Sequence, residues 1–364
     1  MSKRNRDKHV LAKLLRFFLI VVLSLIILTI AGIAFLLVHQ WKNKEDSTMA
    51  TEFHMDVSDI SSEEVSETKE ELFEGMPLDE NGMLTVGDAK FLPGYLANAT
   101  DQTVTIGEDV ISQHAILINE STNEIVAQKD AKTIVSPASM TKILTVLVAA
   151  EHLDSMEALD DDFTITLEMT DFAYRNECSI AGFKNDEVVK VRDLFYGTIL
   201  PSGGDAAMGL AIYTAGSHEA FVDLMNEKLE ELGLSETAHF TNCVGLYDEN
   251  HYCSVYDMAM ILKAAVQNDW CRDVLSMHKY TTTATEQNPE GNIISNWFLR
   301  RIEDKETGGL VLCAKTGFVN QSGSCAASYQ ISDSGTPYIC VTTNSTSSWR
   351  CIYDHVAIYE QFAQ

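Results

Sequence analysis

The chain has 364 residues, of which 46% are hydrophobic, which is enough to bury a sizeable core and argues against wholesale disorder. Acidic residues outnumber basic ones by 53 to 26, giving a formal net charge of -27. A field of that sign repels phosphate backbones, so the composition argues against nucleic acid as a partner.

The first predicted element is a membrane anchor. Residues 17–38 form an apolar run without one charge, 22 residues in length, which would span about 33 Å of a bilayer core of roughly 30 Å. Residues 1–16 hold six basic side chains against one acidic one, so this tail should stay in the cytoplasm. Residues 39–42 offer no small-residue cleavage site, which favours an uncleaved anchor over a signal peptide. We therefore expect a single-pass protein of the cell membrane with its remaining part on the outer face.

An acidic stalk is expected to follow the anchor, over residues 39–106. Residues 45–80 hold thirteen Asp or Glu against Lys69 alone, and no sustained hydrophobic periodicity is present. Such a segment is typical of a solvated spacer. The globular domain is then expected over residues 107–364.

The domain should begin with two strands and a buried helix. The apolar runs His114–Asn119 and Glu124–Gln128 are separated by a turn-like Ser-Thr-Asn stretch, which predicts paired strands. Ser136 is placed to cap a helix over residues 138–153, with Pro137 in its first turn. This helix is apolar on nearly every side, so we expect it to be buried.

A helical middle and a final group of strands complete the expected domain. Helical patterns cover residues 191–200, 205–215, 218–232 and 254–266, with Gly216 and Gly233 as stop signals. Strand patterns return at residues 310–315, 324–330 and 338–343, before a last helix over residues 351–362. Strands on both sides of a helical middle predict an α/β (α+β) fold, with an antiparallel sheet flanked by a helical layer.

The cysteines do not form a recognisable metal or redox motif. The eight are Cys178, Cys243, Cys253, Cys271, Cys313, Cys325, Cys340 and Cys351. Cys243 and Cys253 are near enough in sequence to form a disulfide, and buried free thiols are the alternative. His218-Glu219 lacks the second His of a zinc helix, so neither a metal nor a cofactor is expected.

Three Ser-x-x-Lys pairs occur in the chain, and each could place a hydroxyl and an amine on one helix face. They are Ser66/Lys69, Ser139/Lys142 and Ser276/Lys279. The first lies among carboxylates in the stalk, and the third lies in a polar stretch with no partner. Only the second opens a buried helix, where desolvation disfavours a charged ammonium and would let Lys142 act as a base for Ser139.

Two further motifs follow in order. Ser202 lies in a Gly-rich turn between two predicted helices, and Lys315-Thr316-Gly317 ends a predicted strand. Alone, each is an ordinary turn or strand end. Together, Ser-x-x-Lys, Ser-Gly and Lys-Thr-Gly are the ordered motif set of β-lactamases and penicillin-binding proteins.

Residues 113–364 resemble the serine D-alanyl-D-alanine carboxypeptidases of peptidase family S11, low-molecular-mass penicillin-binding proteins. The similarity extends beyond the three motifs into 137–143, 200–207, 239–248 and 315–325. It implies the DD-peptidase/β-lactamase-like fold, preceded here by one transmembrane helix. It also implies peptidoglycan stem peptides ending in D-Ala-D-Ala as substrate and β-lactam antibiotics as acylating inhibitors. Oligomeric state is not indicated.

The resemblance also implies a role for each motif residue. Ser139 would attack the carbonyl between the two D-Ala residues, Lys142 would take its proton, and Ser202 would relay a proton to the leaving D-Ala. Lys315 and Thr316 would contact the substrate and its terminal carboxylate. The backbone N–H groups of Ser139 and Phe318 would form the oxyanion hole. The substrate-binding set is Lys315, Thr316, Gly317, Phe318 and Arg350, the last as a carboxylate partner or else a solvated helix-start residue.

One departure keeps other readings open. The family's loop motif usually reads Ser-x-Asn, whereas the third position here is Gly204. A weakly catalytic protein that binds peptidoglycan or senses penicillin is therefore an alternative. A β-lactamase on the same fold is another, although no Glu-x-x-x-Asn lies between Ser202 and Lys315 to direct a water. A membrane-tethered partner protein would leave the three motifs unexplained.

Overall fold

The structure is a computed structural model that describes residues 84–86, 89–91 and 95–363. These residues belong to one compact unit of the chain, Gly75–Gln364. The predicted cytoplasmic tail, the membrane segment and most of the stalk lie outside the described residues. Within the part that is described, none of the helices has the length and apolar character needed to cross a bilayer.

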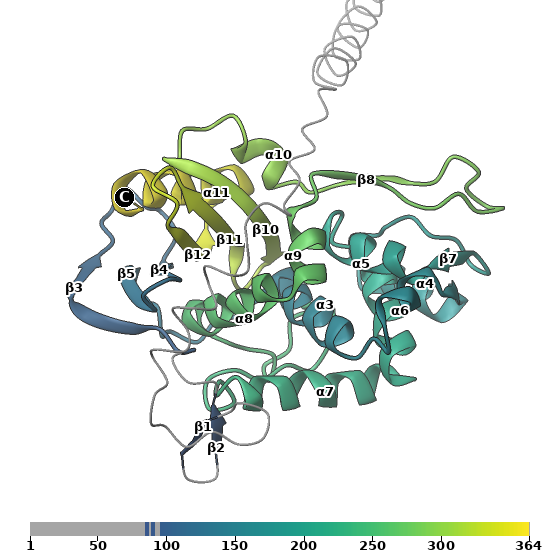
Figure 1. Cartoon of the computed structure of the whole chain (residues 1–364). Helices are drawn as coiled ribbons and strands as arrows, with labels where there is room; N and C mark the ends of the chain where they lie inside the picture. The colour runs from purple at the N-terminus through teal and green to yellow at the C-terminus, as the bar shows by residue number, and fades with distance from the viewer. Residues whose placement is uncertain (1–83, 87–88, 92–94, 364) are drawn as a thin grey trace, which may run out of the picture. The chain divides into compact units, whose positions relative to one another are not determined.

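A six-stranded sheet organises the domain (Figure 1). In spatial order its strands are β10 (Gly309–Val319), β11 (Gly323–Ser332), β12 (Pro337–Ser345), β4 (His114–Asn119), β5 (Glu124–Lys129) and β3 (Asn98–Thr105). Every neighbouring pair is antiparallel except β3, which runs parallel to β5. The chain leaves the sheet after β5 and re-enters it at β10, as the sequence predicts.

Side chains of β4 alternate between two separate cores, because successive residues of a strand point to opposite faces. Ile116 and Ile118 join the core shared with the helical middle. Ala115 and Leu117 join a second core, formed with the C-terminal helix α11 (Ser348–Phe362). The prediction of a single helical layer is therefore incomplete. Helix α11 covers one face of the sheet and α8 (Val255–Gln267) packs on the other.

The helical middle has more elements than the sequence predicts. Its helices are α3 (Thr141–Glu151), α4 (Leu167–Arg175), α5 (Val191–Ile199), α6 (Gly204–Ala215), α7 (His218–Glu231), α8, α9 (Asp269–Ser276) and α10 (Leu299–Ile302). Helices α5 to α8 agree with their predicted ranges to within one residue. Gly216 ends α6 in the left-handed conformation, with φ of 78°, as its role as a stop signal requires. Helices α4, α9 and α10 were not predicted.

Short turns and hairpins connect these elements. They are β1 (Leu84–Val86) with β2 (Ala89–Phe91), β6 (Asp162–Thr164) with β7 (Val188–Lys190), β8 (Lys279–Thr281) with β9 (Ile293–Ser295), and the 3-10 turns η2 (Ala138–Met140) and η3 (Met156–Asp160). Strands of three residues are too short for an alternating pattern to stand out in the sequence.

The stalk boundary predicted at residue 106 is wrong, because β3 lies in the sheet. Seven of its eight side chains are exposed, so the edge strand carries no apolar alternation. Its backbone nevertheless pairs with β5, and Thr103 Oγ1 donates to the carbonyl of Ile125 at 2.7 Å. The hydroxyl of the buried Tyr95 also donates to the carbonyl of Met260. The folded domain therefore includes residues 95–106.

Helix α3 is buried as predicted, but it begins differently. Residues 141–149 are all buried, and the helix packs against α5, α6, α7, α8 and α9. Ser136 does not cap it, because its Oγ has no hydrogen-bond partner and the chain first makes the η2 turn. In that turn Ala138 has a φ of 48°, which is a strained conformation for a residue with a side chain.

All eight cysteines carry free thiols, and only Cys178 among them is not buried. Cys243 Sγ lies 3.7 Å from Met208 Sδ inside the core rather than against Cys253. The sequence left open a Cys243–Cys253 disulfide or free thiols, and the structure has free thiols.

Candidate active site

A cleft of about 750 Å³ opens between the edge strand β10 and the helical middle. Residues predicted for the site from all three motifs line it, namely Ser139, Lys142, Ser202, Thr316, Gly317 and Phe318. Lys315 lies behind the wall, with 2% of its surface exposed. The fold thus gathers segments that are more than 170 residues apart in the chain.

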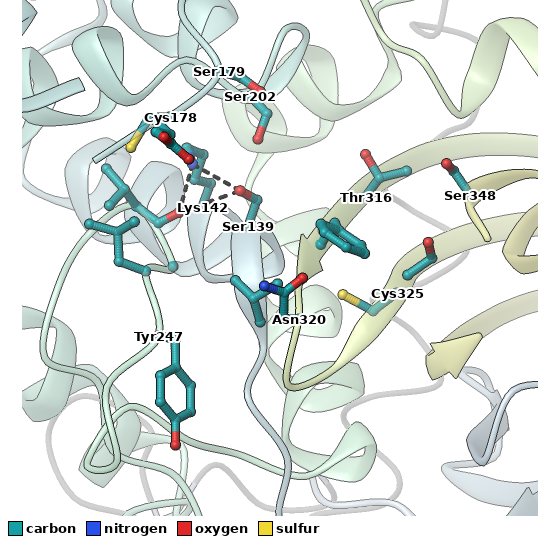
Figure 2. Close-up of a pocket in the computed structure, with 18 of the residues that line it drawn as sticks. Ser139, Lys142, Cys178, Ser179, Ser202, Tyr247, Thr316, Asn320, Cys325 and Ser348 are labelled. Carbon is teal, nitrogen blue, oxygen red and sulfur yellow. Dashed lines mark hydrogen bonds between the residues drawn. The ribbon is translucent and has the colours of Figure 1, made fainter. Parts of the chain in front are cut away.

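Ser139 and Lys142 face each other at the base of this cleft (Figure 2). Ser139 lies in η2 and Lys142 in the first turn of α3, so the spacing of three residues places both side chains on one face. Lys142 Nζ is 3.1 Å from Ser139 Oγ. That distance lets a proton pass from the hydroxyl to the amine when the amine is neutral.

Burial lowers the pKa of Lys142 from 10.5 to about 8. The nearby Asp205 carboxylate opposes this shift but does not cancel it. Roughly a tenth of the Lys142 side chains are then neutral at pH 7, compared with far below one per cent for an exposed lysine. The site therefore holds an amine that can act as a general base near neutral pH.

A turn at residues 242–246 gives Lys142 a second partner. Lys142 Nζ donates to the carbonyl of Val244 at 2.6 Å. Asn242 Oδ1 shapes the turn by accepting from the backbone N–H groups of Val244, Gly245 and Leu246, at 3.2, 2.7 and 3.0 Å. Asn242 thereby positions the base, a role that its Asn-Cys-Val-Gly sequence did not suggest.

Gly245 lets this turn pack directly on the nucleophile's backbone. Its φ is 83°, and a Cβ at this position would lie 1.9 Å from the carbonyl oxygen of Ala138. No other residue fits without moving the turn or η2. The close contact fixes the position of Ser139 relative to Val244.

Ser202 and Lys315 form the second polar pair of the cleft. Lys315 Nζ donates to Ser202 Oγ at 2.9 Å and to the carbonyl of Thr316 at 2.7 Å. Burial, followed by the charge of Lys142, holds the pKa of Lys315 well below its usual value. Ser202 itself has a φ of 63°, a strained conformation of the kind that concentrates at functional sites.

The side chain of Cys178 occupies the space in front of Gly204. A Cβ built on Gly204 would lie 2.7 Å from Cys178 Cβ and 3.1 Å from its Sγ. The Gly204 N–H also donates to the carbonyl of Ser179 at 2.7 Å, which holds the two segments together. Gly204 replaces the usual Asn of Ser-x-Asn, and the thiol of Cys178, from another loop, therefore lies beside it in the cleft.

Asp205 holds that loop in place. Its buried carboxylate accepts from the N–H groups of Ala181 and Gly182, at 2.8 and 3.2 Å. Burial raises the pKa of Asp205, and the backbone donors oppose that shift. Asp205 and Cys178 are both neighbours of Lys142 that the sequence did not single out.

Strand β10 passes close to the nucleophile at Gly317. A Cβ at Gly317 would be 2.9 Å from the Ser139 nitrogen and 2.9 Å from Cys325 Sγ, so a side chain here would push the strand away. Phe318, the next residue, is 64% exposed at the rim. The oxyanion hole expected from the N–H groups of Ser139 and Phe318 stays a prediction.

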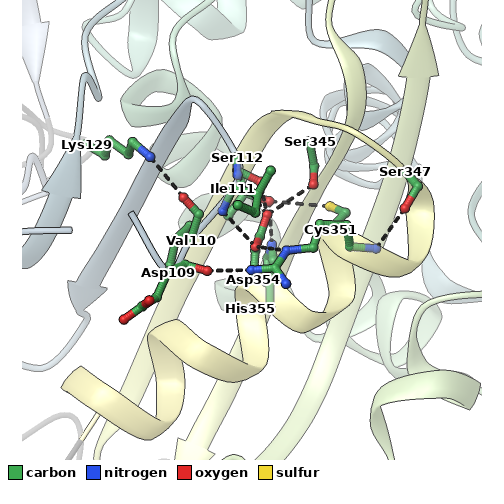
Figure 3. Close-up of polar contacts among 12 residues, drawn as sticks. Asp109, Val110, Ile111, Ser112, Lys129, Ser345, Ser347, Cys351, Asp354 and His355 are labelled. Carbon is green, nitrogen blue, oxygen red and sulfur yellow. Dashed lines mark hydrogen bonds and ion pairs between the residues drawn. The ribbon is translucent and has the colours of Figure 1, made fainter. Parts of the chain in front are cut away.

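Figure 3 shows the polar contacts around Asp354, on the helix that also carries Arg350. Arg350 is not among the residues that line the cleft, so its expected role as a carboxylate partner needs correction. Its Nε donates to Asp354 Oδ1 at 3.0 Å, and its Nη2 donates to the carbonyl of Asp109. Arg350 lies four residues before Asp354 on α11, so its guanidinium is directed toward the fully buried Asp354 carboxylate.

Asp354 has many donors around it. Its carboxylate also accepts from the N–H groups of Ile111 and Ser112, from Ser112 Oγ and from Ser345 Oγ, at 2.6 to 3.0 Å. This network joins the start of β4 to α11. Arg350 therefore serves the fold, while Ser348 from the same helix end lines the cleft.

The cleft thus contains a serine beside a buried lysine, and a second serine beside another buried lysine. This is the arrangement of a serine nucleophile with a lysine base. A family model described as D-alanyl-D-alanine carboxypeptidase, Peptidase_S11, matches residues 98–347. The chain belongs to this family.

Individual relatives agree with this assignment. The chain is 31% identical over 218 residues to D-alanyl-D-alanine carboxypeptidase DacF of Bacillus subtilis, covering 59% of this chain and 52% of the relative. It is 30% identical over 221 residues to the D-alanyl-D-alanine carboxypeptidase of Streptomyces sp. strain K15, covering 58% and 72%. The chain spans about half the length, or less, of the first curated relatives it matches.

Solved structures show the same fold. The crystal structure of the Streptomyces K15 DD-transpeptidase superposes with a TM-score of 0.62 at 26% identity, covering 69% of this chain and 98% of that one. This similarity confirms the mixed α+β DD-peptidase fold predicted from the sequence.

Proposed function

We propose that this protein is a serine D-Ala-D-Ala carboxypeptidase that removes the terminal D-alanine from peptidoglycan stem peptides. The observation that carries the proposal is the buried Lys142, whose Nζ lies 3.1 Å from Ser139 Oγ and whose pKa is lowered to about 8. Family membership and the names of the relatives support the same substrate class.

The reaction begins when Ser139 Oγ attacks the carbonyl carbon of the D-Ala–D-Ala bond. Neutral Lys142 takes the hydroxyl proton as the new C–O bond forms. The negative charge on the former carbonyl oxygen would be stabilised by the N–H groups of Ser139 and Phe318. Collapse of this intermediate breaks the C–N bond and leaves an ester on Ser139.

The leaving D-alanine needs a proton on its amine. Lys315 donates to Ser202 Oγ, so the Ser202 hydroxyl keeps its own hydrogen for the leaving nitrogen. The proton that Lys142 took from Ser139 then replaces the one that Ser202 gave to the leaving amine. Water then attacks the ester, and the same groups act in reverse to release the shortened peptide and regenerate Ser139.

The terminal carboxylate of the substrate would bind at the wall of the cleft that carries Thr316. Thr316 and Ser348 both line the cleft and present hydroxyl donors there, at the end away from Cys178 (Figure 2). The buried Lys315 behind this wall adds electrostatic attraction when it is protonated. Arg350, which is bound to Asp354, is left out of this assignment.

We also propose that residues 17–38 anchor the protein in the cell membrane and that the catalytic domain lies on the outer face. The uncharged run of 22 residues and its basic flank support this arrangement. Fractionation of cells, followed by protease treatment of intact spheroplasts, should find the domain in the membrane fraction and cleaved from outside. If the protease does not cleave the domain in intact spheroplasts, the domain lies on the cytoplasmic side and the proposed orientation is wrong.

The enzymatic proposal is tested by mass spectrometry of the full chain after incubation with benzylpenicillin, together with an assay for released D-alanine. We expect a stable adduct on Ser139, release of D-alanine from a D-Ala-D-Ala pentapeptide, and neither in Ser139→Ala. An adduct without release would favour a binding or sensing protein. Hydrolysed penicillin without a stable adduct would favour a β-lactamase.

A further inference from the structure

Among the described residues, Glu177 is the only acidic one that lines the cleft, and Lys142 is the only basic one. The Glu177 side chain is exposed, and no residue in the described part of the chain forms an ion pair or a hydrogen bond with its carboxylate. The cleft therefore presents one negative charge that is open to a ligand.

The fold itself gives no reason for a glutamate at this position. Helix α4 ends in a Schellman motif, in which the N–H groups of Glu177 and Cys178 donate to the carbonyls of Tyr174 and Ala173, at 3.2 and 2.9 Å. Glycine is usual at this point because φ is positive, yet Glu177 adopts a φ of 52°. Its carboxylate also lies at the negative end of the helix dipole, which disfavours it. A residue that is unfavourable for the fold in two ways is a candidate for a role in binding.

The placement of the substrate determines which part of it passes Glu177. The terminal carboxylate is assigned to Thr316 and Ser348, and Figure 2 shows Thr316 and Cys178 on opposite sides of Ser139. Ser139 attacks the bond between the fourth and fifth residues of a stem pentapeptide. The earlier residues of the peptide therefore extend toward the side of Cys178, which directly follows Glu177 in the chain.

The side chain of the third peptide residue has room on this side. Two residues of extended chain cover about 7 Å from the scissile bond, and a lysine side chain adds a flexible stem of four carbons. Glu177 and Cys178 also line a second hollow of about 550 Å³, together with the apolar side chains of Tyr174, Ile180 and Phe183. These apolar side chains can cover a carbon stem, while Glu177 binds a charged group at its end.

The other acidic residues of this second hollow already have partners. Asp171 is paired with Arg175 at 2.6 Å, and Asp205 accepts from backbone N–H groups of the neighbouring loop. No lysine or arginine is found among the described residues that line the hollow. A cation that enters therefore meets Glu177 as its available partner, and the net charge of -27 favours its approach.

Peptidoglycan stem peptides carry a diamino acid at their third position, lysine or diaminopimelate, whose side-chain amine is charged at neutral pH. We propose that Glu177 binds this amine and selects stem peptides in which it is free. The inference rests on the proposed carboxypeptidase function. In a stem that has accepted a cross-link the amine has become an uncharged amide, so Glu177 favours stems that are not yet cross-linked through it.

The activity test uses the full chain in detergent with two soluble pentapeptides that end in D-Ala-D-Ala. One has lysine at its third position, and the other has Nε-acetyl-lysine, which lacks the charge. We expect wild-type protein to favour the lysine peptide about fivefold in kcat/KM at low salt, mainly through KM, because an exposed ion pair is weak and acts in both the ground state and the transition state. Glu177→Gln should reduce this ratio to about one, and high salt should shrink it.

Two further variants separate recognition from a structural role. Glu168→Gln removes an exposed carboxylate from the first turn of the same helix, outside both hollows, and should keep the wild-type ratio. Glu177→Lys should reverse the preference, so that a peptide with Nε-succinyl-lysine becomes a better substrate than the lysine peptide. A ratio near one in wild-type protein, or a wild-type ratio in both Glu177 variants, would overturn the inference.

A binding test separates this inference from the enzymatic proposal. Fluorescence anisotropy with Ser139→Ala protein should show tighter binding of the labelled lysine peptide, and adding Glu177→Gln should abolish the difference. If wild-type protein releases D-alanine from neither peptide yet Ser139→Ala protein shows this preference, only the enzymatic proposal fails. If D-alanine is released equally from both peptides and binding shows no preference, only the inference fails. Absence of both binding and turnover would end both proposals.

Discussion

Two cations in different parts of this domain, one buried and one partly exposed, behave in opposite ways. Lys142 is 2% exposed and has carbonyl and hydroxyl oxygens as its hydrogen-bond partners. Arg350 meets the fully buried carboxylate of Asp354 at 3.0 Å. The first arrangement disfavours the charged state and creates a base, whereas the second compensates one charge with another and fastens α11 to the start of β4. A basic residue near a cleft is therefore a candidate general base only if no carboxylate is hydrogen-bonded to it.

The largest effect should come from removing the unpaired cation. Lys142→Ala should lower the rate of acylation by penicillin about 10³- to 10⁴-fold, because Ser139 loses its general base. Stopped-flow or mass-spectrometric acylation rates measure the loss, and a melting temperature near that of the wild type would show an intact fold. Acylation at the normal rate would end the assignment of Lys142 as the base.

The pH dependence should follow the lowered pKa of Lys142, about 8. Only the neutral amine accepts a proton, so the acylation rate should rise about tenfold per pH unit below pH 8 and level off above it. Arg350→Ala should leave this profile unchanged. Cys178→Asp, which introduces a carboxylate beside Lys142, should move the midpoint upward by stabilising the charged amine. A profile that is flat between pH 6 and 9 would contradict this mechanism.

Removing the paired cation should cost stability instead of activity. Arg350→Ala should lower the free energy of unfolding by about 2–3 kcal/mol, since Asp354 would keep a buried charge without its cation while Arg350 itself is partly exposed. Urea unfolding followed by circular dichroism measures this. The KM for a D-Ala-D-Ala peptide should change less than twofold or so. Unchanged stability with a strongly raised KM would instead show that Arg350 binds the substrate carboxylate.

The smallest effect concerns the wall of the cleft near Lys142. Gly204→Asn should lower the free energy of unfolding by about 1–2 kcal/mol, because its Cβ would lie 2.7 Å from Cys178 Cβ. Cys178→Gly in the same chain should recover most of that loss by opening the space. If Gly204→Asn is as stable as the wild type and hydrolyses peptide faster, the thiol does not fill the position of the missing amide.

The motifs pointed to the serine and lysine side chains of the cleft because their chemistry requires particular residues at short spacing. Ser139 and Lys142 lie one helical turn apart, and Lys315-Thr316-Gly317 continues an apolar strand, so both could be placed from local patterns. Strand β3 was missed for the opposite reason. Its exposed side chains leave no alternation to detect, and only the backbone pairing with β5 reveals it.

Long-range contacts account for what the sequence could not predict at the site. Asn242 shapes the turn that binds Lys142, and Cys178 fills the space before Gly204, yet neither lies in one of the three motifs. The contacts of Arg350 could not be predicted because Asp109 and Ser112, which contact Arg350 or its partner Asp354, are more than 200 residues away in the chain. The sequence located the backbone of Arg350 near the start of the last helix, but it did not indicate the direction of the Arg350 side chain.

The cysteines differ in burial, and this difference allows one of them, Cys178, to be labelled selectively. Seven thiols are buried, and burial raises the pKa of each, so an alkylating dye meets few thiolates there. Cys178 is part-exposed and lines the same cleft as Ser139. A single fluorophore attached at Cys178 would therefore sit beside the reaction centre of the otherwise unaltered chain, and its emission would follow ligands as they enter and leave.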